Sequence, residues 1–181
     1  NAKLIESCKD SKDMKFNAGT IEFAPGTFDG FNNLEMLTIK ATQKVTFYKG
    51  SMSNLPTFQF LTIDGSADTT LVQFFDNAAT NNAKFGSITI VANKLTLGYE
   101  AFKDCTSLRA VLLNVKDIDF ESSAFCNCGL KEENIQITDY QSASRNKHKC
   151  YLGCCDKNDD GGSSSSNKDS DSGESARILG N

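Results

Sequence analysis

An internal repeat of 23 to 27 residues is the feature that most restricts what this chain can fold into. Five strand-like triplets recur along it, and their last residues are separated by 24, 27, 23 and 24 positions. The triplets are Leu37-Thr38-Ile39, Leu61-Thr62-Ile63, Ile88-Thr89-Ile90, Val111-Leu112-Leu113 and Ile135-Gln136-Ile137. Such a period is typical of proteins that stack one small unit on the next, because a single unit cannot bury its own apolar faces.

A second apolar pair precedes each triplet and also alternates with a period of two. The pairs are Ile21/Phe23, Val45/Phe47, Val72/Phe74, Leu95/Leu97 and Ile118/Phe120. Alternation of this kind turns one side of a strand toward a core. Between each pair and the next triplet, bulky residues are spaced by about three, which predicts one or two turns of helix. Each repeat is therefore predicted to be a strand, a short helical turn and a strand.

Three positions of the predicted helical turn recur as columns from repeat to repeat. The first column is Phe28, Met52, Ala79, Phe102 and Phe125, the middle one is Phe31, Leu55, Asn82, Cys105 and Cys128, and the last is Leu34, Phe58, Phe85, Leu108 and Leu130. We expect parallel strands stacked around one continuous core, with Phe102 and Leu108 almost fully buried. The alternative, a sandwich of unrelated short strands, does not explain why the column order returns five times.

One of these repeats carries a family signature. The run from Ala101 to Leu113, AFKDCTSLRAVLL, resembles the BspA-like leucine-rich repeats, in which an Ala-Phe pair, a Cys and a Leu precede a strand. Residues 28–39 and 124–128 repeat it with variation, and the resemblance covers roughly residues 20–138. It implies a leucine-rich-repeat solenoid in an extracellular or cell-surface protein of bacteria or protists, often adhesive, with no common catalytic activity.

Composition separates the chain into segments. We expect an N-terminal cap over residues 1–19, leucine-rich repeats over 20–139, a Cys-rich C-terminal cap over 140–155 and an acidic Ser/Asp/Gly-rich tail over 156–181. The tail carries six acids against three bases and almost nothing apolar before Ile178 and Leu179, so it is predicted to be flexible. Its Ile178-Leu179 pair is expected to be able to dock on a neighbouring molecule.

Charge and residue usage narrow the function classes. The net charge is −4 and there is no long basic run, so nucleic acid is not expected as a partner. The single His148 leaves few options for acid–base chemistry near neutral pH, which argues against a hydrolase or transferase. No stretch approaches the ~18 apolar residues of a transmembrane helix. The start at Asn1 suggests a removed leader or a beginning inside the gene.

The seven cysteines divide into three groups. Cys105 and Cys128 stand in the middle column, where we expect buried thiols that act as small apolar side chains. Cys126, Cys150, Cys154 and Cys155 are the candidates for disulfides that lock the C-terminal cap. Cys8 lies too many stacked repeats from that cluster for an internal disulfide, so it is the candidate for an intermolecular one.

Two metal sites are conceivable and neither is favoured. His148, Cys150, Cys154 and Cys155 are of zinc-ligand type but lack paired two-residue spacing, and an oxidising compartment would remove the thiols. Asp156, Asn158 and Asp160 match the first half of an EF-hand calcium loop, but position twelve is Asn167 rather than Glu. A solvated linker is the preferred interpretation of this run, and we expect no metal and no cofactor.

Residues that alternate with the buried triplet positions are expected to form an outward face. This candidate binding face carries Met36, Thr38, Lys40, Phe60, Thr62, Asp64, Thr89, Leu112 and Gln136. Repeat proteins use such sheets to bind ligands, although Thr and aromatic residues are also ordinary strand formers. Lys40 and Asp64 should form no more than a surface ion pair.

These observations predict a non-enzymatic extracellular or cell-surface module for protein interaction or adhesion. The competing hypothesis is a structural subunit that assembles head to tail into a filament or sheath. An enzyme is disfavoured, because the chain shows no nucleophile–base pair or metal constellation. The expected partner is a protein or a second copy of the chain.

Overall fold

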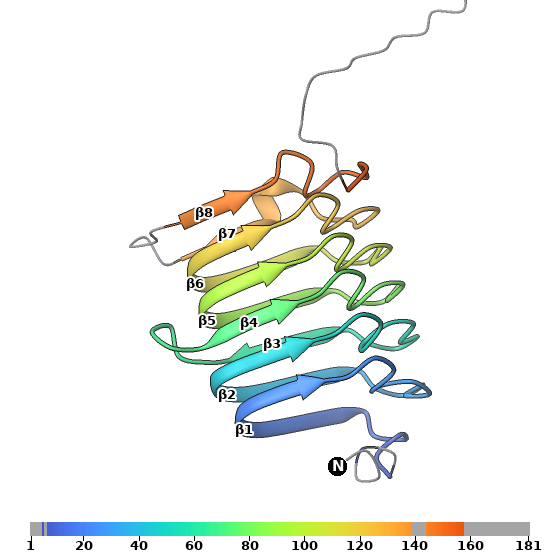
Figure 1. Cartoon of the computed structure of the whole chain (residues 1–181). Helices are drawn as coiled ribbons and strands as arrows, with labels where there is room; N and C mark the ends of the chain where they lie inside the picture. Colours follow the sequence, from blue (N-terminus) through green and yellow to red (C-terminus); the bar gives the residue numbers. More distant parts are fainter. Residues whose placement is uncertain (1–4, 6, 139–143, 158–181) are drawn as a thin grey trace, which may run out of the picture.

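The strands stack as parallel rungs of a solenoid (Figure 1). The computed structural model describes residues 5, 7–138 and 144–157. Its strands are β1 (Asp13–Phe23), β2 (Met36–Phe47), β3 (Phe60–Asp64), β4 (Leu71–Phe74), β5 (Ser87–Leu97), β6 (Ala110–Phe120), β7 (Ile135–Ile137) and β8 (Ser144–Lys147). The strand pairings among the described residues are all parallel and follow the order β1-β2-β3-β5-β6-β7, with β4 between β2 and β5 and β8 on β6. The predicted solenoid of about five turns is confirmed.

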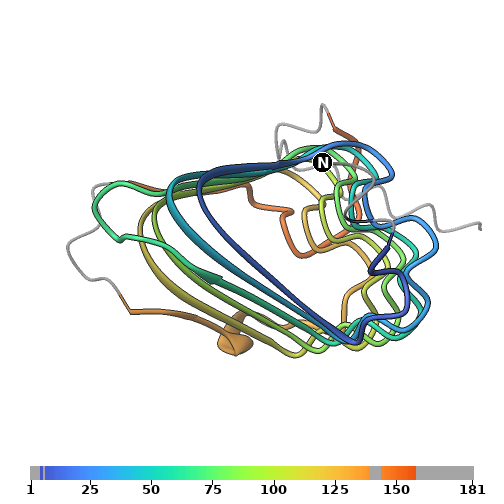
Figure 2. The same ribbon diagram turned by 90° about the horizontal axis from the view of Figure 1, so that it is seen from below.

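Each long strand bends once, so that the sheet has two faces joined at a corner (Figure 2). We name the part built on Met36–Lys40 the first face and the part built on Lys44–Phe47 the second face, because β3 pairs with the former and β4 with the latter. In the third repeat the strand is interrupted at the corner, where residues 65–70 leave the sheet as a loop (Figure 1). This loop accounts for the longer spacing of 27 residues.

The core lies between the two faces and the segments that close each turn. Ten of the largest fully buried side chains are Phe, and they are the ten that the columns place inward: Phe23, Phe28, Phe31, Phe47, Phe58, Phe74, Phe85, Phe102, Phe120 and Phe125. Rings of successive turns stack, as in the 4.4 Å centroid distance between Phe47 and Phe74. Phe102 and Leu108 are fully buried, as predicted.

The predicted helical turns are wrong. The segments that return each turn to the sheet, which we name the turn side, contain tight turns and no α-helix in the part of the chain that the structure describes. A short 3-10 helix, η1 (Glu132–Asn134), precedes β7. Two positions of each turn, four residues apart, have positive φ, a conformation that interrupts an α-helix. They are Gly26/Gly30, Gly50/Asn54, Asn77/Asn81, Glu100/Asp104 and Ser123/Asn127.

Backbone groups of the turn side bond to the next turn as well as within their own turn. The amides of Met52, Ala79 and Phe102 donate to the carbonyls of Ala78, Ala101 and Ala124, at 3.0, 2.8 and 2.8 Å. Because these bonds run along the solenoid axis, a helix with i to i−4 bonds would leave the neighbouring turns unpaired. The turn side is therefore a third hydrogen-bonded layer of the stack.

Pairing begins before residue 20 and continues past residue 139. β1 starts at Asp13 and pairs with β2 over its whole length. At the other end, β8 pairs with β6, and the amide of Phe125 donates to the carbonyl of Tyr151 just as Phe102 donates to Ala124. The segment from β8 to Tyr151 thus follows the path of a further repeat.

Candidate functional site

The outward side chains of the first face form straight rows across the turns. Thr38 lies beside Thr62, Thr62 beside Thr89, Thr89 beside Leu112 and Leu112 beside Gln136. Met36 lies beside Phe60 in a second row, and Lys40 beside Asp64 in a third. The register therefore brings all nine residues of the candidate binding face onto one surface.

Apolar side chains on this face are unusually exposed for their size. Phe60 is 44% exposed and its neighbour Met36 is 36% exposed. Leu112 is exposed farther along the same face. Two large apolar side chains held side by side on a hydrogen-bonded sheet give a rigid contact surface, which lowers the entropy that binding would cost.

Charge on the face is balanced. Lys40 Nζ lies 3.4 Å from Asp64 Oδ2, and both side chains are more than half exposed. An exposed pair of this kind contributes about 0–1 kcal/mol to stability. Its effect on the face is to cancel the local charge, which disfavours a polyanionic partner.

A shallow groove crosses the upper part of the first face. Its walls are Thr89, Val91, Leu112, Asn114, Gln136 and Thr138, and its volume is about 240 Å³. The walls expose mainly carbon, with hydroxyl and amide groups among them. Such a surface suits an uncharged segment of a protein, which can place apolar groups in the groove and polar groups on its rim.

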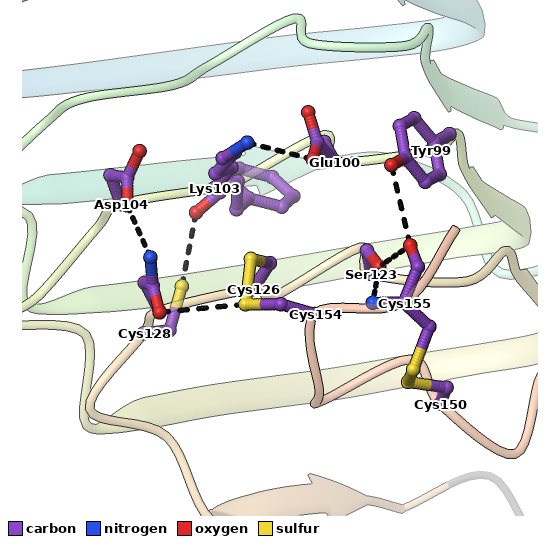
Figure 3. Close-up of a disulfide and its surroundings, with 12 residues drawn as sticks. Tyr99, Glu100, Lys103, Asp104, Ser123, Cys126, Cys128, Cys150, Cys154 and Cys155 are labelled. Atoms are coloured by element: carbon purple, nitrogen blue, oxygen red, sulfur yellow. Dashed lines mark hydrogen bonds and ion pairs between the residues drawn. A yellow bond between two sulfur atoms is a disulfide. The ribbon is translucent and has the colours of Figure 1, made fainter. Parts of the chain in front are cut away.

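One disulfide fastens the C-terminal turn to the stack, and a second lies within that turn (Figure 3). Cys126 bonds Cys154, with Cα atoms 4.8 Å apart, and joins two neighbouring turns. Cys150 bonds Cys155 within the last turn. These are the four candidates from the sequence, and their bonding leaves no thiol among them for a zinc ion.

Residues 155–157 turn back over the turn side toward earlier turns. The Cys155 amide donates to Ser123 Oγ at 2.7 Å, and the Ser123 hydroxyl lies 2.8 Å from the Cys155 carbonyl (Figure 3). Tyr99 donates its hydroxyl to the same carbonyl at 3.3 Å, and Lys157 donates to Asp76. This strap crosses three turns, and no signal in the sequence predicted its direction.

The last three residues of the middle column form a ladder of side-chain donors. Asn82 donates to the Met52 carbonyl at 2.8 Å, Cys105 to Ala79 at 3.2 Å and Cys128 to Phe102 at 3.0 Å. Each donor thus bonds the first-column carbonyl of the preceding turn, so Asn and Cys serve the same purpose here. The neighbouring Cys128 thiol, and then burial, raise the pKa of Cys105 far above its usual range. Cys105 is buried as expected, whereas Cys128 is only half-buried.

The remaining candidates fall at the two ends. Cys8 is free and half-buried against the core beside β1. Asp156 is described, whereas Asn158, Asp160 and the Ile178-Leu179 pair lie outside the described residues. Among the described residues, no three His, Cys, Asp or Glu side chains are grouped so that they could hold a metal ion.

Sequence reasoning missed two further exposed apolar side chains. Leu71 on the second face is 44% exposed and Phe75 on the turn side is 38% exposed. The Phe75 ring stacks on Tyr48 at 5.0 Å. Leu71 is exposed because it points outward in β4. Its outward position could be predicted from the sequence, because it alternates with the inward Val72 and Phe74.

Comparison with known proteins agrees with this geometry. The family model for the BspA type leucine rich repeat region matches residues 73–155 with six copies. The matched residues make up just under half of the chain. The match includes β8 and the cysteines as far as Cys155, in agreement with the path of the last turn. The searches of curated proteins and of solved structures found no match.

Within the part of the chain that the structure describes, no helix has the length and apolar character needed to cross a membrane.

Proposed function

We propose that this BspA-type repeat protein binds a protein partner through its first face, as an extracellular or cell-surface recognition or adhesion module. The observation that carries the proposal is the Met36–Phe60 pair, which lies exposed on a sheet beside the Thr38–Thr62–Thr89 row. Aromatic and Met side chains are enriched at the centres of protein interfaces, where charged residues are depleted. The balanced charge of the face supports the same assignment.

The cysteines support a location outside the cytosol. Two disulfides clamp the last turn, and disulfides persist mainly in oxidising compartments. Outside the cell, a terminal turn that no disulfide holds would open and become accessible to proteases. The disulfides therefore protect the end of the stack, while the first face provides the contact.

The head-to-tail filament receives less support from the described residues. The inward column of Phe23, Phe47, Phe74, Leu97 and Phe120 ends at Lys147 of β8. Lys147 bonds Glu132 and lies over the Tyr151 ring at 5.2 Å, and the Tyr151 hydroxyl bonds Glu132 as well. A charged cluster at the C-terminal end disfavours stacking of a further apolar turn on it.

Binding of matched variants to cultured epithelial cells tests the proposal, with the labelled chain as the ligand and intact or trypsin-treated cells as the probe. The Met36→Ala/Phe60→Ala variant should lose binding by at least about tenfold, as for residues at an interface centre. The control Leu71→Ala/Phe75→Ala removes similarly exposed side chains elsewhere. Trypsin treatment should abolish binding of the unmodified chain. Equal binding by both variants, or binding that survives trypsin, would contradict a protein partner at the first face.

A further inference from the structure

The N-terminal end of the solenoid has a free strand edge. β1 is eleven residues long, and one of its edges pairs with β2 from Asp13 to Phe23. No strand of the described residues pairs with the other edge. An edge of this length without a Pro or an inward charge is a template for pairing with another chain.

Apolar side chains are open at this end. Phe16 and Ile21 are only half-buried, whereas Ile39 and Val45, their counterparts in the next turn, are fully buried. Phe16, Ile21 and Phe23 line a hollow of about 350 Å³ together with Ile5. The C-terminal end differs, because Lys147, Glu132 and Tyr151 close it with polar contacts.

The sequence of β1 is complementary to itself when it is reversed about the corner between Ala18 and Gly19. In an antiparallel pair centred there, the inward Phe16 faces an inward Ile21, and Met14 faces Phe23. The outward Lys15 faces an outward Glu22, and Asn17 faces Thr20. The irregularity in the β1–β2 register between Ala18 and Thr20 makes this match possible, because it shifts the alternation by one residue at the corner.

We propose that two copies of the chain associate through the free edges of β1, antiparallel and related by a two-fold axis at the Ala18–Gly19 corner. The contact is isologous, so each pair of residues occurs twice. Lys15 of one copy meets Glu22 of the partner subunit on both sides of the axis. Glu22 stays exposed in its own subunit, 3.5 Å from Lys44, and can accept a second cation.

This dimer is closed and leaves the Met36–Phe60 pair of each copy on the surface. It therefore differs from a filament, which would need the C-terminal end. It is also independent of partner binding at the first face, because neither Met36 nor Phe60 belongs to β1.

Charge exchange between Lys15 and Glu22 tests the proposal by analytical ultracentrifugation of the full chain. The unmodified protein should form dimers as its concentration rises. Lys15→Glu and Glu22→Lys, each alone, should raise the dimer dissociation constant about tenfold, since each places like charges together twice. The double variant Lys15→Glu/Glu22→Lys should recover most of the affinity. Lys84→Glu, the same charge change at an exposed turn-side position, should have no effect.

Ile21→Lys provides a second variant, because it adds an inward charge at the open end. It should abolish the dimer while circular dichroism keeps the spectrum of the unmodified chain. A monomer at all concentrations would overturn the proposal. A dimer dissociation constant that neither single charge reversal changes would also overturn it, as would oligomers of more than two copies.

Discussion

At the scale of single residues, each inward side chain stabilises more than one turn. The Phe102 ring lies 4.8 Å from Phe74, 6.0 Å from Phe85 and 5.5 Å from Phe125 by centroid. These rings belong to the preceding turn and the following one. A change at one inward position is therefore felt by its neighbours along the axis.

Replacement of Phe102 by Ala should lower the free energy of unfolding by about 3–5 kcal/mol, through lost burial and a cavity between three turns. Phe60→Ala is the matched control, because the same atoms are removed from an exposed position, and it should cost within ~0.5 kcal/mol. Urea titration measures both. A loss below about 1 kcal/mol for Phe102→Ala would contradict the inward column.

The raised pKa of Cys105 makes stability depend on alkaline pH. In the unfolded chain the thiol ionises near pH ~8.5, whereas in the fold the Cys128 thiol and burial keep it protonated. Its contribution is fully present below that pH and is lost as pH rises toward the folded pKa. Above the pKa of the unfolded chain, and below that of the folded chain, the free energy of unfolding should fall by at most about 1.4 kcal/mol per pH unit.

Cys105→Ser keeps a donor for the Ala79 carbonyl but does not ionise in this range, so it is the control for the pH series. The difference in unfolding free energy between the two proteins should change from pH 7 to pH 10. A constant difference would show that Cys105 ionises equally in both states.

At the scale of elements, the strands could be predicted and the segments between them could not. Period-two alternation around Leu37, Val45 and their equivalents identifies the strands, because only one side of each strand meets the core. The spacing of three residues between Phe28, Phe31 and Leu34 fits a helix. It fits equally well a tight turn whose backbone amides donate to the next turn of the solenoid. The signal that separates the two is a Gly, Asn or Asp at eight of the ten positions with positive φ, such as Asn77 and Asn81, since these residues tolerate that conformation.

The candidate site, like the fold, could be predicted from the sequence only in part. The first face follows from alternation, so Met36 and Phe60 could be placed outward from the sequence alone. The strap of residues 155–157 could not, because its contacts with Ser123, Tyr99 and Asp76 depend on where distant turns lie in space. Pairing of the four cap cysteines was open for the same reason.

Removing one disulfide at a time should distinguish how much each of the two disulfides contributes to the stability of the last turn. Cys126→Ser/Cys154→Ser opens a link with a sequence separation of 28 and should cost about 3.5 kcal/mol in the chain-entropy account. Cys150→Ser/Cys155→Ser opens a link with a separation of 5 and should cost about 2 kcal/mol.

Hydrogen exchange then localises the effect. Loss of the Cys126–Cys154 link should speed exchange in β8 and the strap, while β2 and β5 keep their protection, because terminal turns open first. Equal acceleration along the whole stack would contradict the role of this disulfide as a clamp of the end.

At the scale of the whole molecule, the two ends and the first face have different surfaces. The C-terminal end is closed by disulfides and by the Lys147–Glu132–Tyr151 cluster, whereas the N-terminal end exposes the edge of β1. The first face lies on hydrogen-bonded strands and carries the balanced Lys40–Asp64 pair. We infer that association of copies and recognition of a partner use separate surfaces.

The most direct test of recognition by the first face is hydroxyl-radical footprinting of the chain, free and bound to membrane vesicles from the cells used for binding. Oxidation of Met36 and Phe60 should fall severalfold on binding, because both side chains leave water. Oxidation of Phe75 and Leu71, of similar exposure in the free chain, should stay unchanged. Protection of Phe75 and Leu71 with Met36 and Phe60 still fully oxidised would contradict the account.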